Sequence, residues 1–163
     1  MPDHYESGVD VTSPIPVLEC VVVTPEATAL ETPAQFVILP LYDGEMGVWP
    51  HHSPFIGRLG YGELRVKENG KLFRFYVDGG FVQVADGVVS VLTNNAVPAD
   101  KLNVAVAREQ LAAARARKAN SPELLAIRER LQQQARAQLR IAEHGRSPSD
   151  IHVGGSADAR MSS

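Results

Sequence analysis

Four polar side chains in one short segment have the residue types of a catalytic or metal-binding site. Asp43 and Glu45 flank Gly44, and His51 is followed directly by His52. Paired carboxylates serve in general acid–base catalysis, and histidines are common zinc ligands. A zinc site needs several converging ligands, however, and adjacent residues of an extended segment point to opposite faces. Asp43 is also a typical turn residue, so we predict neither a catalytic group nor a metal site here.

The remaining reactive residue types give no catalytic pattern. Cys20 is the single cysteine, so the chain cannot form an internal disulfide. It lies in the apolar run Val17–Thr24, which favours a buried and inert thiol. Gly57, Gly60 and Gly62 are not followed by a helix pattern, so they are predicted to mark turns rather than a phosphate-binding loop. The sequence therefore predicts no enzyme and no cofactor.

Basic residues at helical spacing are the stronger functional candidate. They are Lys101, Arg108, Arg115, Arg128, Arg136 and Arg140. The first three recur every seven residues, which places them along one face of a helix. Ordinary solvated charge is the alternative explanation, because a single exposed ion pair contributes only about 0–1 kcal/mol. Several cations together can hold an acidic partner, and we predict that these residues form a regulatory basic face.

Length and composition fit one domain, or one small domain with an appendage. The chain has 163 residues, 44% of them hydrophobic, and a formal net charge of -3. Nucleic-acid-binding domains are usually basic, unlike this chain. No apolar run approaches the roughly 20 residues that span a bilayer, and the first residues lack the basic and apolar parts of a signal peptide. We expect no nucleic-acid partner, no direct membrane insertion and a cytosolic chemistry.

Composition changes abruptly near residue 99. Nine of the thirteen glycines lie between Gly44 and Gly87, whereas residues 99–144 contain no glycine, one proline and twelve alanines. Glycine marks turns, and alanine is the strongest helix former. The charge is −8 over residues 1–100 (five Lys/Arg, thirteen Asp/Glu) and +5 over residues 101–144 (nine and four). The predicted parts are a disordered extension (1–16), a β-sandwich (17–98), a helical hairpin (99–145) and a disordered tail (146–163).

Short apolar runs separated by turn residues predict the strands of the first part. Val17–Thr24 and Phe36–Leu41 are two such runs. Asn69-Gly70 and Asp86-Gly87 each separate two alternating runs, which is the pattern of a tight hairpin. About seven or more short strands at this spacing predict an antiparallel sandwich or flattened barrel.

Two helices are predicted in the second part. The first runs from an N-cap at Asp100 to Lys118, and the second begins at Ser121-Pro122 and ends near His144. Their predicted apolar faces are Leu102, Val106 and Ala113 on the first, and Leu124, Ile127, Leu131, Ala135, Leu139 and Ala142 on the second. A short connection makes the helices antiparallel. Because an alanine side chain buries little apolar area, we expect the helical hairpin to dock weakly on the β-sandwich and to be able to leave it.

Four short segments share their residues and spacing with one known family. They are Val22–Glu26 (VVTPE), Asp43–Pro54 (DGEMGVWPHHSP), Tyr76–Val84 (YVDGGFVQV) and Val89–Ala96 (VSVLTNNA). The second and third are similar to a D-G-E-x-G-x-x-P-G-H-x-P segment and a Y-x-x-G-G-x-x-x-V hairpin. The fourth is similar to a V-x-V-L-x-x-x-A strand that precedes two helices. Together they resemble the epsilon subunit of rotary ATP synthases over about residues 17–144.

The resemblance implies an α+β fold, with a flattened antiparallel β-sandwich of about ten strands followed by an antiparallel two-helix hairpin. It also implies a non-catalytic central-stalk subunit that binds the gamma subunit, contacts the c-ring and couples proton-driven rotation to ATP synthesis. The loops carrying Asp43, Glu45, His51 and His52 would face the ring. The hairpin would extend to the beta subunits and inhibit ATP hydrolysis. The implied location is peripheral, on the cytoplasmic face of the bacterial inner membrane.

Two departures from the family pattern bear on ligand binding. His51 stands where the family has the glycine of G-H, which changes the local turn. Some members bind ATP through an [IL]-D-x-x-R-A motif, in which this chain has Asn103 for the carboxylate and Val106 for the arginine. Arginine is a principal phosphate ligand, so ATP sensing by this route is not expected. A ligand-sensing sandwich with a helical lid is the alternative function, and a His-dependent metalloenzyme is a third.

Overall fold

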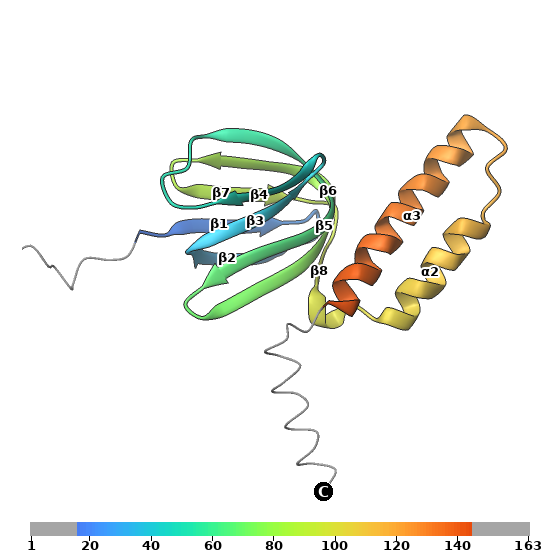
Figure 1. Cartoon of the computed structure of the whole chain (residues 1–163). Coiled ribbons are helices and arrows are strands. Elements are labelled where there is room, and N and C mark those ends of the chain that lie inside the picture. Colours follow the sequence, from blue (N-terminus) through green and yellow to red (C-terminus); the bar gives the residue numbers. More distant parts are fainter. Residues whose placement is uncertain (1–15, 145–163) are drawn as a thin grey trace, which may run out of the picture.

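The computed structural model describes residues 16–144, which form a β-sandwich followed by two packed helices (Figure 1). The strands are β1 (Leu18–Val23), β2 (Thr28–Ala34), β3 (Phe36–Leu41), β4 (Gly44–Val48), β5 (Phe55–Glu68), β6 (Lys71–Ala85), β7 (Val88–Leu92) and β8 (Ala96–Pro98). The helical elements are the 3-10 turn η1 (Ala99–Lys101) and the helices α2 (Val104–Ala116) and α3 (Pro122–Glu143). Except for Pro16, the tails predicted to be disordered lie outside the described residues.

Two long strands contribute to both layers of the sandwich, which is why residues 16–144 form eight strands where about ten were expected. The strand order is β2-β1-β7-β6-β5-β3-β4, and β8 also pairs with β6. The second half of β6 pairs with β7 in one layer, and its first half pairs with β8 in the other. Likewise, β3 pairs mainly with the second half of β5. Each long strand therefore belongs to both layers, although it is a single strand in the count.

The sheet departs in one pair from the predicted antiparallel arrangement. β1 and β7 run parallel, with Glu19 opposite Val88 and Val23 opposite Leu92. The other pairs are antiparallel. Strands joined by a hairpin must run antiparallel, whereas strands far apart in the chain are under no such constraint.

Both predicted tight hairpins are confirmed. Asn69 and Gly70 have φ angles of 43° and 80°, and Asp86 and Gly87 have φ angles of 52° and 76°, as two-residue hairpin turns require. The prediction that Gly57–Gly62 marks turns was wrong, because these glycines lie inside β5. They allow β3 to approach closely: a Cβ atom on Gly62 would lie 2.9 Å from Cβ of Pro40.

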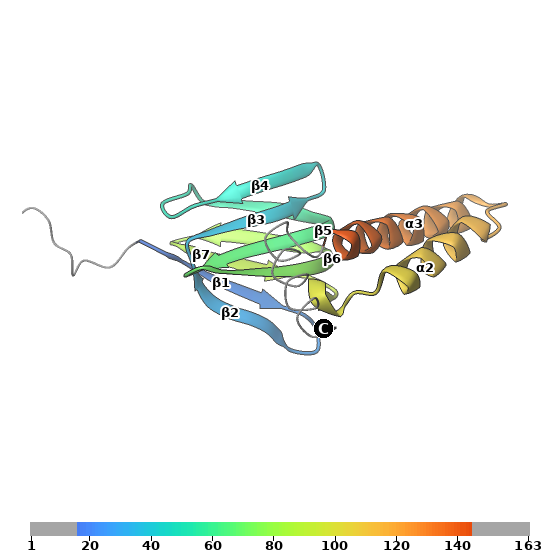
Figure 2. The same cartoon turned by 60° about the horizontal axis from the view of Figure 1, so that its bottom comes forward.

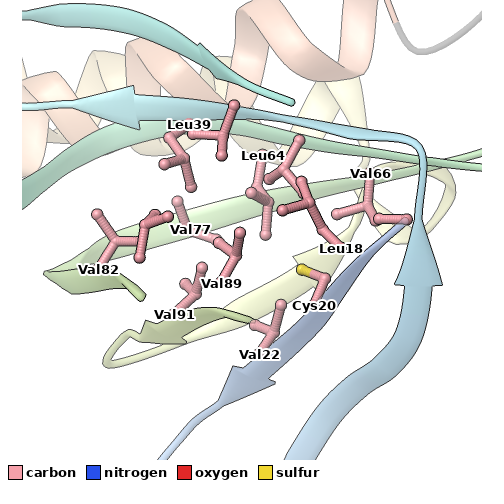
Figure 3. Packing of buried hydrophobic residues seen from close by; sticks show 14 of the residues in the cluster. Leu18, Cys20, Val22, Leu39, Leu64, Val66, Val77, Val82, Val89 and Val91 are labelled. Atoms are coloured by element: carbon pink, nitrogen blue, oxygen red, sulfur yellow. The ribbon is translucent and has the colours of Figure 1, made fainter. Parts of the chain in front are cut away.

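The core lies between the two layers and consists mainly of valine and leucine (Figure 3). Leu39, Leu64, Val77 and Val82 are among its fully buried members. Cys20 is also fully buried there, as the sequence predicted. Since these side chains come from residues 18–91, the core of the sandwich includes no side chain from α2 or α3.

Two details of the helices correct the sequence-based predictions. The N-cap of α2 is Asn103, whose side chain accepts a hydrogen bond from the Val106 amide at 3.1 Å; Asp100 lies in η1 instead. Val106 is 47% exposed, and the buried α2 residues are Ala107, Leu111 and Ala114. The predicted start of α3 is confirmed, because the Ser121 hydroxyl accepts from the Leu124 amide at 3.2 Å and Pro122 follows it.

Candidate functional site

The hairpin contacts the sandwich through the C-terminal half of α3, beside β5 and β6 (Figures 1 and 2). Ala137 and Ile141 of α3 are buried against Tyr76 of β6, and Tyr61 and Leu102 pack at the margin of this contact. The contact is a cluster separate from the sandwich core. The N-terminal half of α3 and the turn that precedes it extend beyond the sandwich (Figure 2).

A polar contact lies beside this apolar cluster. The Gln134 side-chain amide donates a hydrogen bond to Oδ1 of Asp78 at 2.8 Å, and the Tyr76 hydroxyl donates to the same oxygen at 3.2 Å. Burial, and then the nearby Asp78 carboxylate, raises the pKa of Tyr76, so its hydroxyl remains a donor. The three side chains therefore form a network that joins β6 to α3.

A bend in β6 positions Asp78. Its main-chain amide donates to the Thr93 hydroxyl at 3.0 Å and to the Asn95 carbonyl at 3.1 Å. Its carbonyl accepts from the Asn94 side chain at 3.1 Å. The bend continues through Gly79 and Gly80 and needs their positive φ angles of 68° and 105°. Asp78 is thus held at a fixed point where the strand crosses from one layer to the other.

Asp43 and Glu45 lie at the end of the sandwich that is next to the hairpin. Asp43 is in the turn between β3 and β4, and Glu45 is in β4. The Arg65 guanidinium donates to Oε2 of Glu45 at 2.9 Å. Glu45 and Arg140 of α3 line the same shallow groove. Glu45 is therefore already ion-paired, next to the hairpin.

His51 and His52 lie at the other end of β4. The His52 ring Nδ1 is 2.7 Å from the Ser53 carbonyl oxygen, to which it donates when protonated at that nitrogen. His51 has a φ of 69°, so it adopts the left-handed conformation that glycine usually takes. Trp49 is 53% exposed and stacks on Phe36 with ring centroids 5.5 Å apart.

The four residues predicted to face one partner are thus divided between the two ends of β4. Five strand residues separate these ends by about 13 Å, at about 3.3 Å per residue. Within residues 16–144, β4 is an edge strand that pairs with β3. Among residues 16–144, no group of three His, Cys, Asp or Glu side chains could hold a metal ion.

The predicted basic residues do not share one face. Lys101 precedes α2, whereas Arg108 and Arg115 are exposed on it. Arg108 pairs with Glu143 of α3 at 3.1 Å, which joins the base of one helix to the other. Arg136 and Arg140 line a groove beside Tyr42 and Tyr61 of the sandwich. Arg128 is half-buried on α3.

An exposed apolar face that was not predicted from the sequence lies on the layer formed by β5, β6 and β7. Ile56, Phe81 and Leu92 are 76%, 59% and 54% exposed. They lie on the outward side of alternating strand positions, and Phe81 is paired with Leu92. A groove of about 580 Å³ adjoins Phe81 and Leu92. Tyr42 and Arg58 also line it, and the Arg58 guanidinium stacks on the Tyr42 ring, 4.3 Å from its centroid. The sequence did contain an indication of this face: Phe81 is an apolar residue at an outward position of a strand whose residues alternate between the two faces.

Sequence comparison places the chain among ATP synthase subunits. Residues 17–99 match the family described as the ATP synthase delta/epsilon chain, beta-sandwich domain. The ATP synthase epsilon chain of Rhodopirellula baltica is 48% identical over 125 residues, covering 77% of this chain and 98% of the relative. That of a Synechococcus species is 36% identical and covers 76% and 92%.

Solved structures with similar folds include a chain of the Euglena gracilis mitochondrial ATP synthase, determined with its c-ring. It is 26% identical, covers 88% of this chain and 96% of its own length, and has a TM-score of 0.72. A chain from the central stalk and c-ring of the Tetrahymena thermophila enzyme has a TM-score of 0.62 at 12% identity and supports the fold alone. No helix within residues 16–144 is long and apolar enough to cross a membrane.

Proposed function

The chain belongs to the ATP synthase delta/epsilon family, and from this premise we propose that it is a central-stalk subunit which couples c-ring rotation, through the gamma subunit, to ATP synthesis. The epsilon chain is a non-catalytic subunit of that complex. The relatives are bacterial epsilon chains, and the proposed location is the cytoplasmic face of the inner membrane, as a peripheral component.

One observation carries the proposal: an apolar face on an otherwise well-packed sandwich. Ile56, Phe81 and Leu92 would be costly to leave in water, and clustered exposed apolar residues mark protein interfaces. The hairpin does not cover them, because α3 lies beside Tyr76 and Tyr61 instead. We assign this face to the gamma subunit, the rotor partner that the family resemblance implies.

The c-ring contact is proposed for the free edge of β4. If this edge lies along the ring, the β3–β4 turn with Asp43 and the β4–β5 loop with His51 and His52 can both reach it, despite lying at opposite ends of the strand. Glu45 lies on the same strand, where its ion pair with Arg65 holds it in place.

The hairpin is proposed as the inhibitory element. Its cations, including Arg115 and Arg128, would contact an acidic surface on the beta subunits after the hairpin leaves the sandwich. The buried α3 side chains of this contact are Ala137 and Ile141, so undocking the hairpin gives up little buried apolar area and costs little free energy. At roughly 25 cal/mol per Å² of apolar area, an alanine contributes little to docking.

Reconstitution tests this function. ATP synthase lacking this subunit should regain proton-driven ATP synthesis when the chain is added, and its ATP hydrolysis should fall. The matched control is the Phe81→Ser/Leu92→Ser variant, which alters the apolar face and leaves the hairpin intact. Equal recovery by this variant, or no recovery by the wild-type chain, would contradict the proposal.

A further inference from the structure

We propose that Asp78 and Gln134 form a polar latch that determines how much of the time the hairpin is docked on the sandwich. This inference rests on the proposed function, in which the hairpin is a movable arm. The latch is the hydrogen bond of 2.8 Å from the Gln134 amide to the Asp78 carboxylate. Both side chains are half-buried at the joint between β6 and α3.

The apolar part of the joint is small, so a single polar contact can decide the balance. The buried α3 side chains in the joint are Ala137 and Ile141, and one of these is an alanine. A hydrogen bond to a charged acceptor is stronger than one between neutral groups. Asp78 also pairs with Tyr76, so its removal would leave the buried Tyr76 hydroxyl without this acceptor.

Hydrogen bonds within the sandwich fix the main chain of Asp78 independently of the hairpin. Thr93, Asn94 and Asn95 all bond to its amide or carbonyl. Gly80, two residues later, cannot carry a side chain there, because a Cβ atom would lie 1.9 Å from the Leu92 carbonyl oxygen. The main chain of Asp78 is therefore fixed by bonds within the sandwich, and the Tyr76 hydroxyl, also part of the sandwich, bonds to its carboxylate, so docking has less to order first.

The neighbour of Gln134 provides a matched control. Gln133, one residue earlier on α3, is exposed and lines a groove whose lining includes Arg136 and Arg140 and not Asp78. Gln134→Glu places a carboxylate against Asp78, whereas Gln133→Glu makes the same change of charge at an exposed position near Arg136 and Arg140. Adding Asp78→Asn to the Gln134→Glu variant restores a donor and an acceptor with their roles exchanged, because the asparagine amide can donate to the new carboxylate.

Spin labels on the full chain measure docking. Glu26→Cys and Asn120→Cys place one label on an exposed turn of the sandwich and the other at the tip of the hairpin. Cys20 is fully buried and does not compete for the label. The docked population of Gln133→Glu should be no lower than that of wild type. In Gln134→Glu the ratio of docked to undocked chains should fall about tenfold or more, and Asp78→Asn should reverse most of this fall.

A docked population that is unchanged in Gln134→Glu, or that falls equally in Gln133→Glu, would overturn the latch. Failure of Asp78→Asn to restore docking would also overturn it, since the loss would then not depend on this pair. Thermal unfolding of each variant checks that the sandwich is intact. Distances in the free chain test the latch, whereas ATP hydrolysis by the reconstituted complex tests inhibition. A released hairpin without any change in hydrolysis would refute the inhibitory role and leave the latch standing.

Discussion

Phe81 of β6 and Leu92 of β7 lie directly opposite each other in the sheet, and both side chains are more than half exposed. On the same strands, Val82 and Val91 point inward and are fully buried. The alternation of a β-strand thus gives one pair of strands a packed inner face and an apolar outer face. A sandwich that is already stable has no structural need for the outer pair, which is therefore available for a partner.

Replacing this outer pair should affect assembly and spare folding. Phe81→Ser/Leu92→Ser should change the free energy of unfolding of the isolated chain by less than about 1 kcal/mol, because the residues are exposed. Retention in the ATP synthase complex should fall at least about tenfold, as expected for residues at the centre of an interface. Leu72→Ser is the matched control, because Leu72 is 44% exposed at the far end of β6. Equal retention of both variants would remove Phe81 and Leu92 from the interface.

The cations of the hairpin should act together. Arg115→Ala/Arg136→Ala/Arg140→Ala should relieve inhibition of ATP hydrolysis severalfold in the reconstituted complex, because several weak contacts to an acidic surface are lost at once. Lys71→Ala, which removes an exposed cation of the sandwich at the end of β6 far from Phe81, should leave inhibition unchanged. Arg108 is kept out of the set because its pair with Glu143 joins the two helices. If hydrolysis by the triple variant matches wild type, these cations have no role in inhibition.

Cys20 should be unreactive until the sandwich unfolds. Burial is the main cause that raises the pKa of this thiol from 9.0 to about 12, with a smaller contribution from Glu19. Thiol reagents at pH 8 should therefore modify the chain in urea and leave the native chain unmodified. Rapid labelling of native protein would contradict the buried position.

The same shift predicts a loss of stability at high pH. Below pH 9 the thiol is protonated in both states, and its contribution to folding is fully present. As the pH rises from 9.0 towards 12, the unfolded chain loses this proton and the folded chain keeps it, so the free energy of unfolding falls. The slope is at most about 1.4 kcal/mol per pH unit. Urea unfolding of Cys20→Ala over this range should lack that part of the decline, and parallel curves would refute the shift.

Gly80 should tolerate no side chain, in contrast to Gly87. Gly80→Ala combines a positive φ of 105° with a Cβ atom only 1.9 Å from the Leu92 carbonyl oxygen. It should lower the free energy of unfolding by about 3 kcal/mol or more. Gly87 also has a positive φ, but a Cβ atom there meets nothing within 4 Å, so Gly87→Ala should cost about 1–2 kcal/mol. Urea unfolding compares the two, and equal costs would contradict the bend at Gly80.

The local features of the fold could be predicted from the sequence because neighbouring residues encode them. Asn69-Gly70 and Asp86-Gly87 define hairpins by their left-handed conformations, and Ser121-Pro122 defines the start of α3. The length of β5 could not be predicted in this way. Glycine in a strand and glycine in a turn look alike in sequence, and the close approach of Pro40 that explains Gly62 is a tertiary feature.

The site was harder to predict, because contacts between distant residues define it. Gln134 and Asp78 are 56 residues apart, and no local pattern links them. Asp43 and His52 are near neighbours in sequence, but β4 separates them because it runs straight between the turn and the loop. The even spacing of Lys101, Arg108 and Arg115 suggested one helix face, but the helix starts only after Asn103.

The central claim is that the sandwich alone binds the gamma subunit, whereas the hairpin can undock from the sandwich. Direct binding to the gamma subunit tests this claim. Isothermal titration would compare the full chain with residues 1–103, which retain every side chain of the sandwich core. We expect each form to bind one gamma subunit per chain, with dissociation constants that agree within about threefold. Absence of binding by the full chain, or binding that disappears with the hairpin, would contradict the claim.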